Sequence, residues 1–287
     1  MKIFLRFFLV CSLAFFGCKK PKNYSTAPDA FFLKTDNVVV STTVGTQGSN
    51  SNKISDCWLY VNGQFKGSYP VGATLPIVST GYTELAIFPG IKNNGISDTR
   101  QPYEFYAPIK FDTIVDPKTI LNRKLNFIYK PDAVFHFIES FEGFGTTTGI
   151  TLSKTIYSDA DFTILNNDPD VYEGNKCMYF ALGGGPRRAE FQSNALYPLP
   201  ASGAPVYLEL NYKCDAPFEV GVYNGSTFRS VIVVNSSHDW NKIYCQLSYG
   251  VSSQPVFTKY GIFIRATNTN DNDYPRFFID NLKLISY

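Results

Sequence analysis

The chain contains little charge, little histidine and little tryptophan. Charged residues occupy 17% of the 287 positions, against about 25% in a typical globular domain. With two tryptophans, a tryptophan-rich stacking platform is excluded. The two histidines, His136 and His238, lie outside any Gly-x-Ser-x-Gly or His-Glu-x-x-His motif, so we predict structural or surface roles for both and no enzymatic activity. A glycan hydrolase is the alternative, because the separation of two catalytic carboxylates is a tertiary property.

The composition is nevertheless that of a folded protein. Hydrophobic residues make up 44% of the chain and aromatic residues 16%. Disordered chains combine low hydrophobicity with high charge, so disorder is excluded for most of the sequence. The length indicates about two domains, at roughly 100–200 residues each.

The apolar run at residues 7–16 is too short to span a membrane, since a spanning helix needs about 20 residues. Lys2 and Arg6 precede it, as in a secretory signal peptide. The following Gly17-Cys18 pair resembles the lipobox of bacterial lipoproteins. That resemblance implies acylation of Cys18 and a lipid anchor in the membrane. An ordinary signal peptide with an incidental cysteine is the alternative.

We therefore expect a signal peptide over residues 1–17 and a lipidated, flexible tether over residues 18–33. No aspartate stands at the second mature position and no acidic run follows. These absences favour the outer membrane of a Gram-negative envelope, on the periplasmic side rather than the cell surface. Loss of Lys2 and Arg6 leaves 24 basic and 24 acidic residues, so we expect no binding to nucleic acid.

From Val38 onward, short apolar runs alternate with glycine, asparagine, aspartate and proline, which predicts an all-β protein. The Pro131-Asp132 pair separates two series of predicted strands, over residues 34–131 and 134–287. In the first series, Asn62-Gly63 is a strong hairpin signal between two alternating strands. This pattern resembles PEGA-type and other prealbumin-like modules, which implies a small β-sandwich that acts as a spacer.

The second series contains four short sequence motifs whose order along the chain is informative. They are the opening Phe141-Glu142-Gly143, the strand at 174–182, Trp240 before the strand at 243–247, and Phe278-Ile279-Asp280-Asn281-Leu282. Their order resembles the calcium-stabilised jelly-roll carbohydrate-binding modules, which have a galactose-binding-like fold. The resemblance implies a jelly-roll β-sandwich that binds glycan without cleaving it.

The same resemblance implies a structural calcium ion. Glu142 and Asp280 match its carboxylate ligands, and a backbone carbonyl near Glu173 to Lys176 would complete the site. Asp280 lies in a strongly apolar strand, where an isolated buried charge is costly. The alternative is that Asp280 and Asn281 occupy a turn or bind backbone amides.

A glycan-binding surface follows from strand alternation. Glu209 and Asn211 point to one face of their strand, while Leu208 and Leu210 point to the other. Arg265 likewise lies opposite its apolar neighbours, so Glu209, Asn211 and Arg265 are expected to line one concave polar surface. The remaining candidates, in or near adjacent loops, are Tyr223, Asn224, Arg187, Arg188 and Glu190. A solvated face with paired arginines and glutamates is the alternative.

Four cysteines remain after removal of Cys11 and acylation of Cys18. Cys214 and Cys245 are both expected to face the core. They form either a disulfide, which an oxidising envelope permits, or two buried thiols.

The sequence as a whole predicts a lipid-anchored, non-catalytic binding protein for glycan or another envelope component. The competing prediction is a structural subunit of an envelope machine, such as a secretion or gliding apparatus. A flat apolar surface patch would favour this second function.

Overall fold

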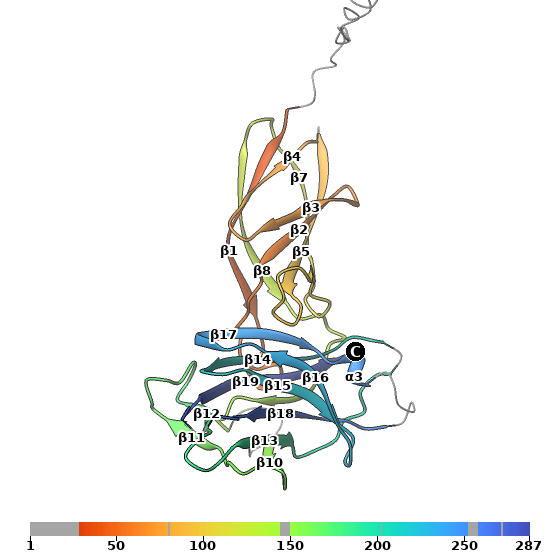
Figure 1. Cartoon of the computed structure of the whole chain (residues 1–287). Coiled ribbons are helices and arrows are strands. Elements are labelled where there is room, and N and C mark those ends of the chain that lie inside the picture. Colours follow the sequence, from red (N-terminus) through yellow and green to blue (C-terminus); the bar gives the residue numbers. More distant parts are fainter. Residues whose placement is uncertain (1–28, 80, 144–149, 202, 252–257, 271) are drawn as a thin grey trace, which may run out of the picture.

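The computed structural model describes residues 29–79, 81–143, 150–201, 203–251, 258–270 and 272–287. The predicted signal peptide, Cys18 and most of the predicted tether lie outside these residues. The described chain is almost entirely β-structure arranged in two sandwiches, which confirms the predicted fold class (Figure 1). No helix among the described residues is long and apolar enough to cross a membrane.

The N-terminal sandwich packs a sheet of order β4-β1-β8 against a sheet of order β3-β2-β5-β6, in which β7 also pairs with β5. Its strands are β1 (Phe31–Ser41), β2 (Asp56–Val61), β3 (Gln64–Pro70), β4 (Thr74–Ile77), β5 (Tyr82–Lys92), β6 (Arg100–Pro102), β7 (Ile109–Ile114) and β8 (Ile120–Ile128). The predicted tether over 18–33 is therefore too long, because Phe31 and Leu33 are already buried in β1.

Local sequence explains the best-formed hairpin of this sandwich. Cys57 and Leu59 are buried on one face of β2, and Trp58 lies on the other. Asn62 and Gly63 have φ values of 49° and 73°, as the predicted tight turn between β2 and β3 requires.

The C-terminal sandwich contains two larger sheets. We call the sheet β11-β12-β19-β14-β17, with β9 paired to β19, the junction sheet, and the sheet β10-β13-β18-β15-β16 the distal sheet. The strands are β9 (Val134–Glu139), β10 (Leu152–Lys154), β11 (Thr163–Asn166), β12 (Lys176–Ala181), β13 (Arg188–Ser193), β14 (Val206–Cys214), β15 (Phe218–Tyr223), β16 (Phe228–Val234), β17 (Ser237–Gln246), β18 (Gly261–Thr267) and β19 (Arg276–Ser286). Two single-turn helices complete the described elements, α2 (Val44–Gln47) and α3 (Ser248–Val251).

The core of the C-terminal sandwich lies between these two sheets. Leu208 and Leu210 of β14 face Ile262 and Ile264 of β18 across it, together with aromatic rings such as Phe277. Glu209 and Arg265 alternate with these apolar residues and therefore lie on the outer faces of their sheets. The first and last strands, β9 and β19, are paired.

The N-terminal sandwich stands on the outer face of the junction sheet, and the distal sheet lies on the far side of the molecule (Figure 1). Tyr207, Tyr244 and Ile285 of the junction sheet extend the apolar core of the N-terminal sandwich. Asn93 and Tyr244 form a parallel β-bridge across the junction. The two sandwiches thus share a packed, hydrogen-bonded interface.

Candidate functional site

The predicted glycan residues lie on two opposite outer faces. Glu209 and Asn211 belong to β14 of the junction sheet, whereas Arg265 belongs to β18 of the distal sheet. The expectation that these three line one concave surface is therefore wrong. Strand alternation identified the outward side chains correctly, but each sheet has its own outer face.

The N-terminal sandwich covers Glu209 completely. The Tyr103 and Tyr129 hydroxyls donate hydrogen bonds of 2.7 and 2.9 Å to Glu209 Oε1. Glu209 Oε2 lies 2.7 Å from Nζ of Lys242. Burial by itself raises the pKa of Glu209, but the ammonium groups of Lys242 and Lys283 outweigh that effect and hold the pKa below its usual value. Glu209 is thus a charged core residue of the junction.

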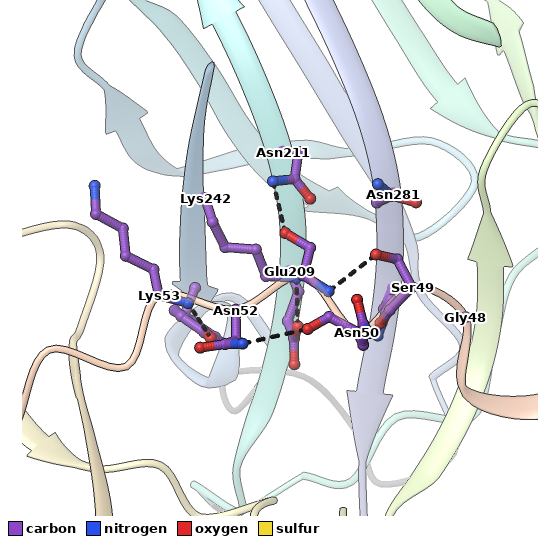
Figure 2. A network of polar contacts seen from close by, with 12 residues as sticks. Gly48, Ser49, Asn50, Asn52, Lys53, Glu209, Asn211, Lys242 and Asn281 are labelled. Carbon is purple, nitrogen blue, oxygen red and sulfur yellow. Dashed lines mark hydrogen bonds and ion pairs between the residues drawn. The ribbon is translucent and has the colours of Figure 1, made fainter. Parts of the chain in front are cut away.

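Asn211 is covered by another part of the N-terminal sandwich, the segment before β2. Residues 48–53 cross the outer face of the junction sheet beside Glu209, Asn211 and Asn281 (Figure 2). Asn211 Nδ2 donates a 2.9 Å hydrogen bond to Ser51 Oγ. Both Glu209 and Asn211 are therefore sealed from any glycan in this structure.

The distal face, meaning the outer face of the distal sheet, carries a row of charged residues across three neighbouring strands. Glu190 of β13, Arg265 of β18 and Glu219 of β15 stand at the same level of the sheet. Arg265 Nε donates to Glu190, and Arg265 Nη1 lies 3.2 Å from Glu219 Oε2. The guanidinium is consequently held between two carboxylates.

Glu190, at one end of this row, is fully buried. Its carboxylate also accepts hydrogen bonds from Arg188 Nη2 at 2.6 Å and from the Thr155 hydroxyl at 2.9 Å. Burial opposes ionisation of Glu190, but Arg265, Thr155 and Arg188 together lower its pKa. A fixed negative charge therefore orients the two arginines.

Two glycines let aromatic rings lie flat on the distal face. A Cβ atom on Gly221 would lie 2.5 Å from the Phe263 ring, and one on Gly261 would lie 2.2 Å from the Tyr223 ring. Phe228 stacks on Tyr223 with centroids 5.2 Å apart and meets Phe263 edge-on at 5.3 Å. The guanidinium of Arg265 lies over Phe263, 4.6 Å from its centroid.

The rim of this aromatic cluster is open to solvent. Tyr157 is 56% exposed, and its ring meets Phe228 edge-on at 6.2 Å. The Arg188 guanidinium lies 5.9 Å from the centroid of the Tyr157 ring. An exposed ring beside oriented arginines can stack on the apolar face of a sugar while guanidinium donors bind its hydroxyls.

The structure thus brings together four of the sequence candidates: Arg265, Arg188, Glu190 and Tyr223. Arg187 precedes β13 and is exposed. Its backbone carbonyl accepts a hydrogen bond from the backbone N–H of Asn268. Arg188 and Glu190 lie within β13 rather than in a loop.

Sequence reasoning missed Glu219, Tyr157 and Phe228. Glu219 lies on β15, and the pairing of β15 with β18 places it beside Arg265.

The predicted calcium residues do meet near the paired strands β9 and β19. Asp280 is 1% exposed, and its Oδ2 atom has no hydrogen-bond partner among the described residues. Burial raises the pKa of Asp280 to about 8, and the nearby carboxylates of Glu173 and Glu142 act in the same direction. Three neighbouring acidic residues, and an Asp280 Oδ2 atom without a hydrogen-bond partner among the described residues, are features that a bound cation would satisfy.

The other two carboxylates are already engaged. Glu142 Oε1 accepts hydrogen bonds from the backbone amides of Asn175 and Lys176 at 2.6 and 2.5 Å. Glu173 Oε2 accepts from Ser49 and from Asn281 Nδ2. Among the described residues, no three histidine, cysteine, aspartate or glutamate side chains converge as a metal site. The site would need backbone carbonyls or water as further ligands.

Cys214 and Cys245 are buried free thiols, so the disulfide alternative is wrong and the thiol alternative holds. Both face the core as expected. Cys245 pairs with Leu208, six residues before Cys214 on β14. At about 3.3 Å per residue, the two cysteines are about 20 Å apart along the strands, far beyond disulfide reach.

Comparisons of the sequence with protein-family models and with curated proteins find no match. Solved structures that are similar include a family 29 carbohydrate-binding module in complex with mannohexaose, with 14% identity, a TM-score of 0.35, and 53% of this chain and 92% of that chain covered. A xylan-binding domain of family 22 has 17% identity and a TM-score of 0.35, and the match covers 54% and 97% of the two chains. A family 61 module in complex with β-1,4-galactotriose has 13% identity and a TM-score of 0.31, with 47% and 87% covered.

Proposed function

We propose that this protein is a non-catalytic glycan-binding protein that uses the distal face. The row of Glu190, Arg265 and Glu219 beside the exposed ring of Tyr157 is the observation that carries the proposal. Two carboxylates hold Arg265 in one orientation, so little side-chain freedom is lost when it binds a ligand hydroxyl.

The position of the face suits an anchored binding protein. We propose that Cys18 is acylated and holds the chain on the periplasmic side of the outer membrane. The described chain begins at the end of the N-terminal sandwich remote from the distal face (Figure 1). The N-terminal sandwich would then act as a rigid spacer that presents the distal face away from the membrane.

Calorimetric titration with neutral oligosaccharides of glucan, mannan, galactan and xylan tests this function. At least one should bind wild-type protein, and Tyr157→Ala should weaken that binding by about tenfold, the equivalent of one lost stacking contact. Tyr82→Ala is a matched control, because Tyr82 is 58% exposed but lies in the N-terminal sandwich. Equal binding by wild-type and Tyr157→Ala protein would overturn the assignment of the face.

A structural subunit of an envelope machine is the second candidate function. Tyr82 and Ile114 are paired neighbours on β5 and β7, and both side chains are largely exposed. Exposed apolar neighbours of this kind favour contact with another protein. Cross-linking in cells from a photoreactive residue at position 114 should capture a defined partner if this function holds, and Lys66 is a suitable control position.

A further inference from the structure

A cleft of about 670 Å³ lies between the two sandwiches. The turn after β5, around Asn94 and Gly95, forms one wall. The other wall is formed by β17, the turn before it and residues 231–233 of β16, the edge strand of the distal sheet. The volume lies within the range of small-molecule sites in proteins. The cleft reaches this edge of the distal sheet, where Val233 pairs with Glu219. The row of Glu190, Arg265 and Glu219 does not line the cleft, so the two sites use different side chains.

The lining of the cleft is strongly basic. Lys53 and Lys92 enter from the N-terminal sandwich and Lys242 from β17, and no aspartate or glutamate occurs among the described lining residues. Glu209, behind Lys242, forms an ion pair with that lysine. Figure 2 shows Lys242 reaching toward Glu209 while the Lys53 side chain turns away from it.

Lys53 and Lys92 lie close enough to repel each other. Burial and the Lys92 ammonium group both lower the pKa of Lys53. Lys53 Nζ donates a hydrogen bond to Asn241 Oδ1. Asn241 Nδ2 in turn donates a 3.0 Å hydrogen bond to the Tyr212 hydroxyl. An anion between the two ammonium groups would relieve their repulsion.

The walls of the cleft are held in place without a ligand. The Asn94 amide donates to the Tyr244 carbonyl at 3.0 Å, and the Gln246 amide donates to Asn94 Oδ1 at 2.8 Å. Gly95 has a φ of 73°, which favours glycine. A Cβ atom added at this position would lie 3.3 Å from the Ile243 side chain. A preformed site loses less entropy on binding than a mobile one.

We propose that this cleft binds a sugar that carries a carboxylate or sulfate group. Lys53 is exposed and Lys92 is half-buried, whereas Lys242 is buried. Lys53 and Lys92 would therefore contact the anionic group. Asn94 Nδ2 and the side-chain amide of Asn235 supply donors and an acceptor for hydroxyl groups. Asn241 is already bonded to Lys53 and Tyr212. Carbohydrate chemistry fits this mixture of cations and amides better than a simple inorganic anion does.

Isothermal titration of the full mature chain with trigalacturonate tests the proposal, and a sulfated chondroitin tetrasaccharide distinguishes sulfate from carboxylate. Methyl-esterified trigalacturonate is the neutral match, because it keeps the sugar rings and removes the charge. Wild-type protein should bind one acidic probe at least about tenfold more tightly than the neutral match. The affinity should fall with added salt, since exposed charges are screened.

The double variant Lys53→Gln/Lys92→Gln should lose about tenfold or more of this affinity, whereas the exposed-lysine control Lys66→Gln/Lys124→Gln should keep it. Tyr157→Ala should leave it unchanged, which separates this site from the distal face. The proposal is overturned if neither acidic probe binds at millimolar concentration, if the double variant binds as wild type, or if inorganic sulfate binds as tightly as the sugars.

Discussion

Glu209 and Lys242 form an ion pair of 2.7 Å whose side chains are 0% and 3% exposed, at the centre of the junction between the two sandwiches. Strand pairing places them next to each other, since Glu209 faces Tyr244 and Asn211 faces Lys242 across β14 and β17. Tyrosine hydroxyls from the N-terminal sandwich bind the same carboxylate. The pair lies on the junction sheet but is bound by both sandwiches, and we predict that it couples their stability.

Glu209→Gln should destabilise the protein strongly. The substitution leaves Lys242 and Lys283 buried without a counter-charge, and breaking a buried ion pair typically costs about 3–5 kcal/mol. Urea denaturation followed by tyrosine fluorescence measures the change in the free energy of unfolding. Asp36→Asn is the control, because the Lys34–Asp36 pair is exposed and should contribute less than about 1 kcal/mol. A loss no larger than that of the control would contradict the coupling role.

The contribution of Lys283 to stability should rise with pH above neutrality. Burial lowers the pKa of Lys283 to about 7, from its usual value of 10.5. Above pH 7 the unfolded state therefore binds more protons at this residue than the folded state, and the contribution of Lys283 increases with pH by up to about 1.4 kcal/mol per pH unit. Asp280, whose pKa is raised to about 8, contributes a slope of the opposite sign between pH 7 and about 8.5, so the test is the difference between wild-type and Lys283→Met protein across that window.

Urea midpoints across that window measure the slope. Lys283→Met should make this slope more negative than in wild-type protein, because only the opposing contribution of Asp280 remains, while Lys124→Met at an exposed position should retain the wild-type slope. An equal slope in wild-type and Lys283→Met protein would show that Lys283 does not titrate near neutrality.

Gly221→Ala should disturb the distal face. The new Cβ atom would lie 2.2 Å from the Arg229 carbonyl and 2.5 Å from the Phe263 ring. We expect a loss of about 1–3 kcal/mol in the free energy of unfolding, together with weaker glycan binding, because Phe263 supports Arg265. Gly45→Ala is the control, since nothing lies within 4 Å of a Cβ there. Wild-type stability and binding in Gly221→Ala protein would be evidence against this packing.

We predict that calcium stabilises the protein through Asp280. A ligand that binds only the native state raises the melting temperature, so calcium should raise Tm relative to chelator in wild-type protein but not in Asp280→Asn. Asp273→Asn is the control, because Asp273 lies in the asparagine-rich turn before β19. No rise in wild-type protein would rule out the calcium site.

Local sequence was sufficient for local structure. The alternation around Cys57 and Leu59 predicted which side of β2 is buried, and Asn62-Gly63 predicted its turn. These features depend on residues within a few positions of one another. The start of β1 at Phe31 was missed, because pairing with β4 and β8, rather than composition, makes residues 31–33 a strand.

The candidate site was predictable only in part. Arg265, Arg188 and Tyr223 do share the distal face, whereas Glu209 and Asn211 lie beneath the other sandwich. A period of two distinguishes the two sides of a strand but does not specify which sheet the strand joins or what covers that sheet.

The sequence by itself determined that the chain is all-β, which side chains point outward, and that Cys214 and Cys245 face a core. The tertiary structure alone decided that those cysteines are too far apart to pair, that Glu209 is an interface residue and that Glu219 supports Arg265. The physical reason is that strand register and sandwich docking depend on contacts between residues distant in the chain, which no local pattern records.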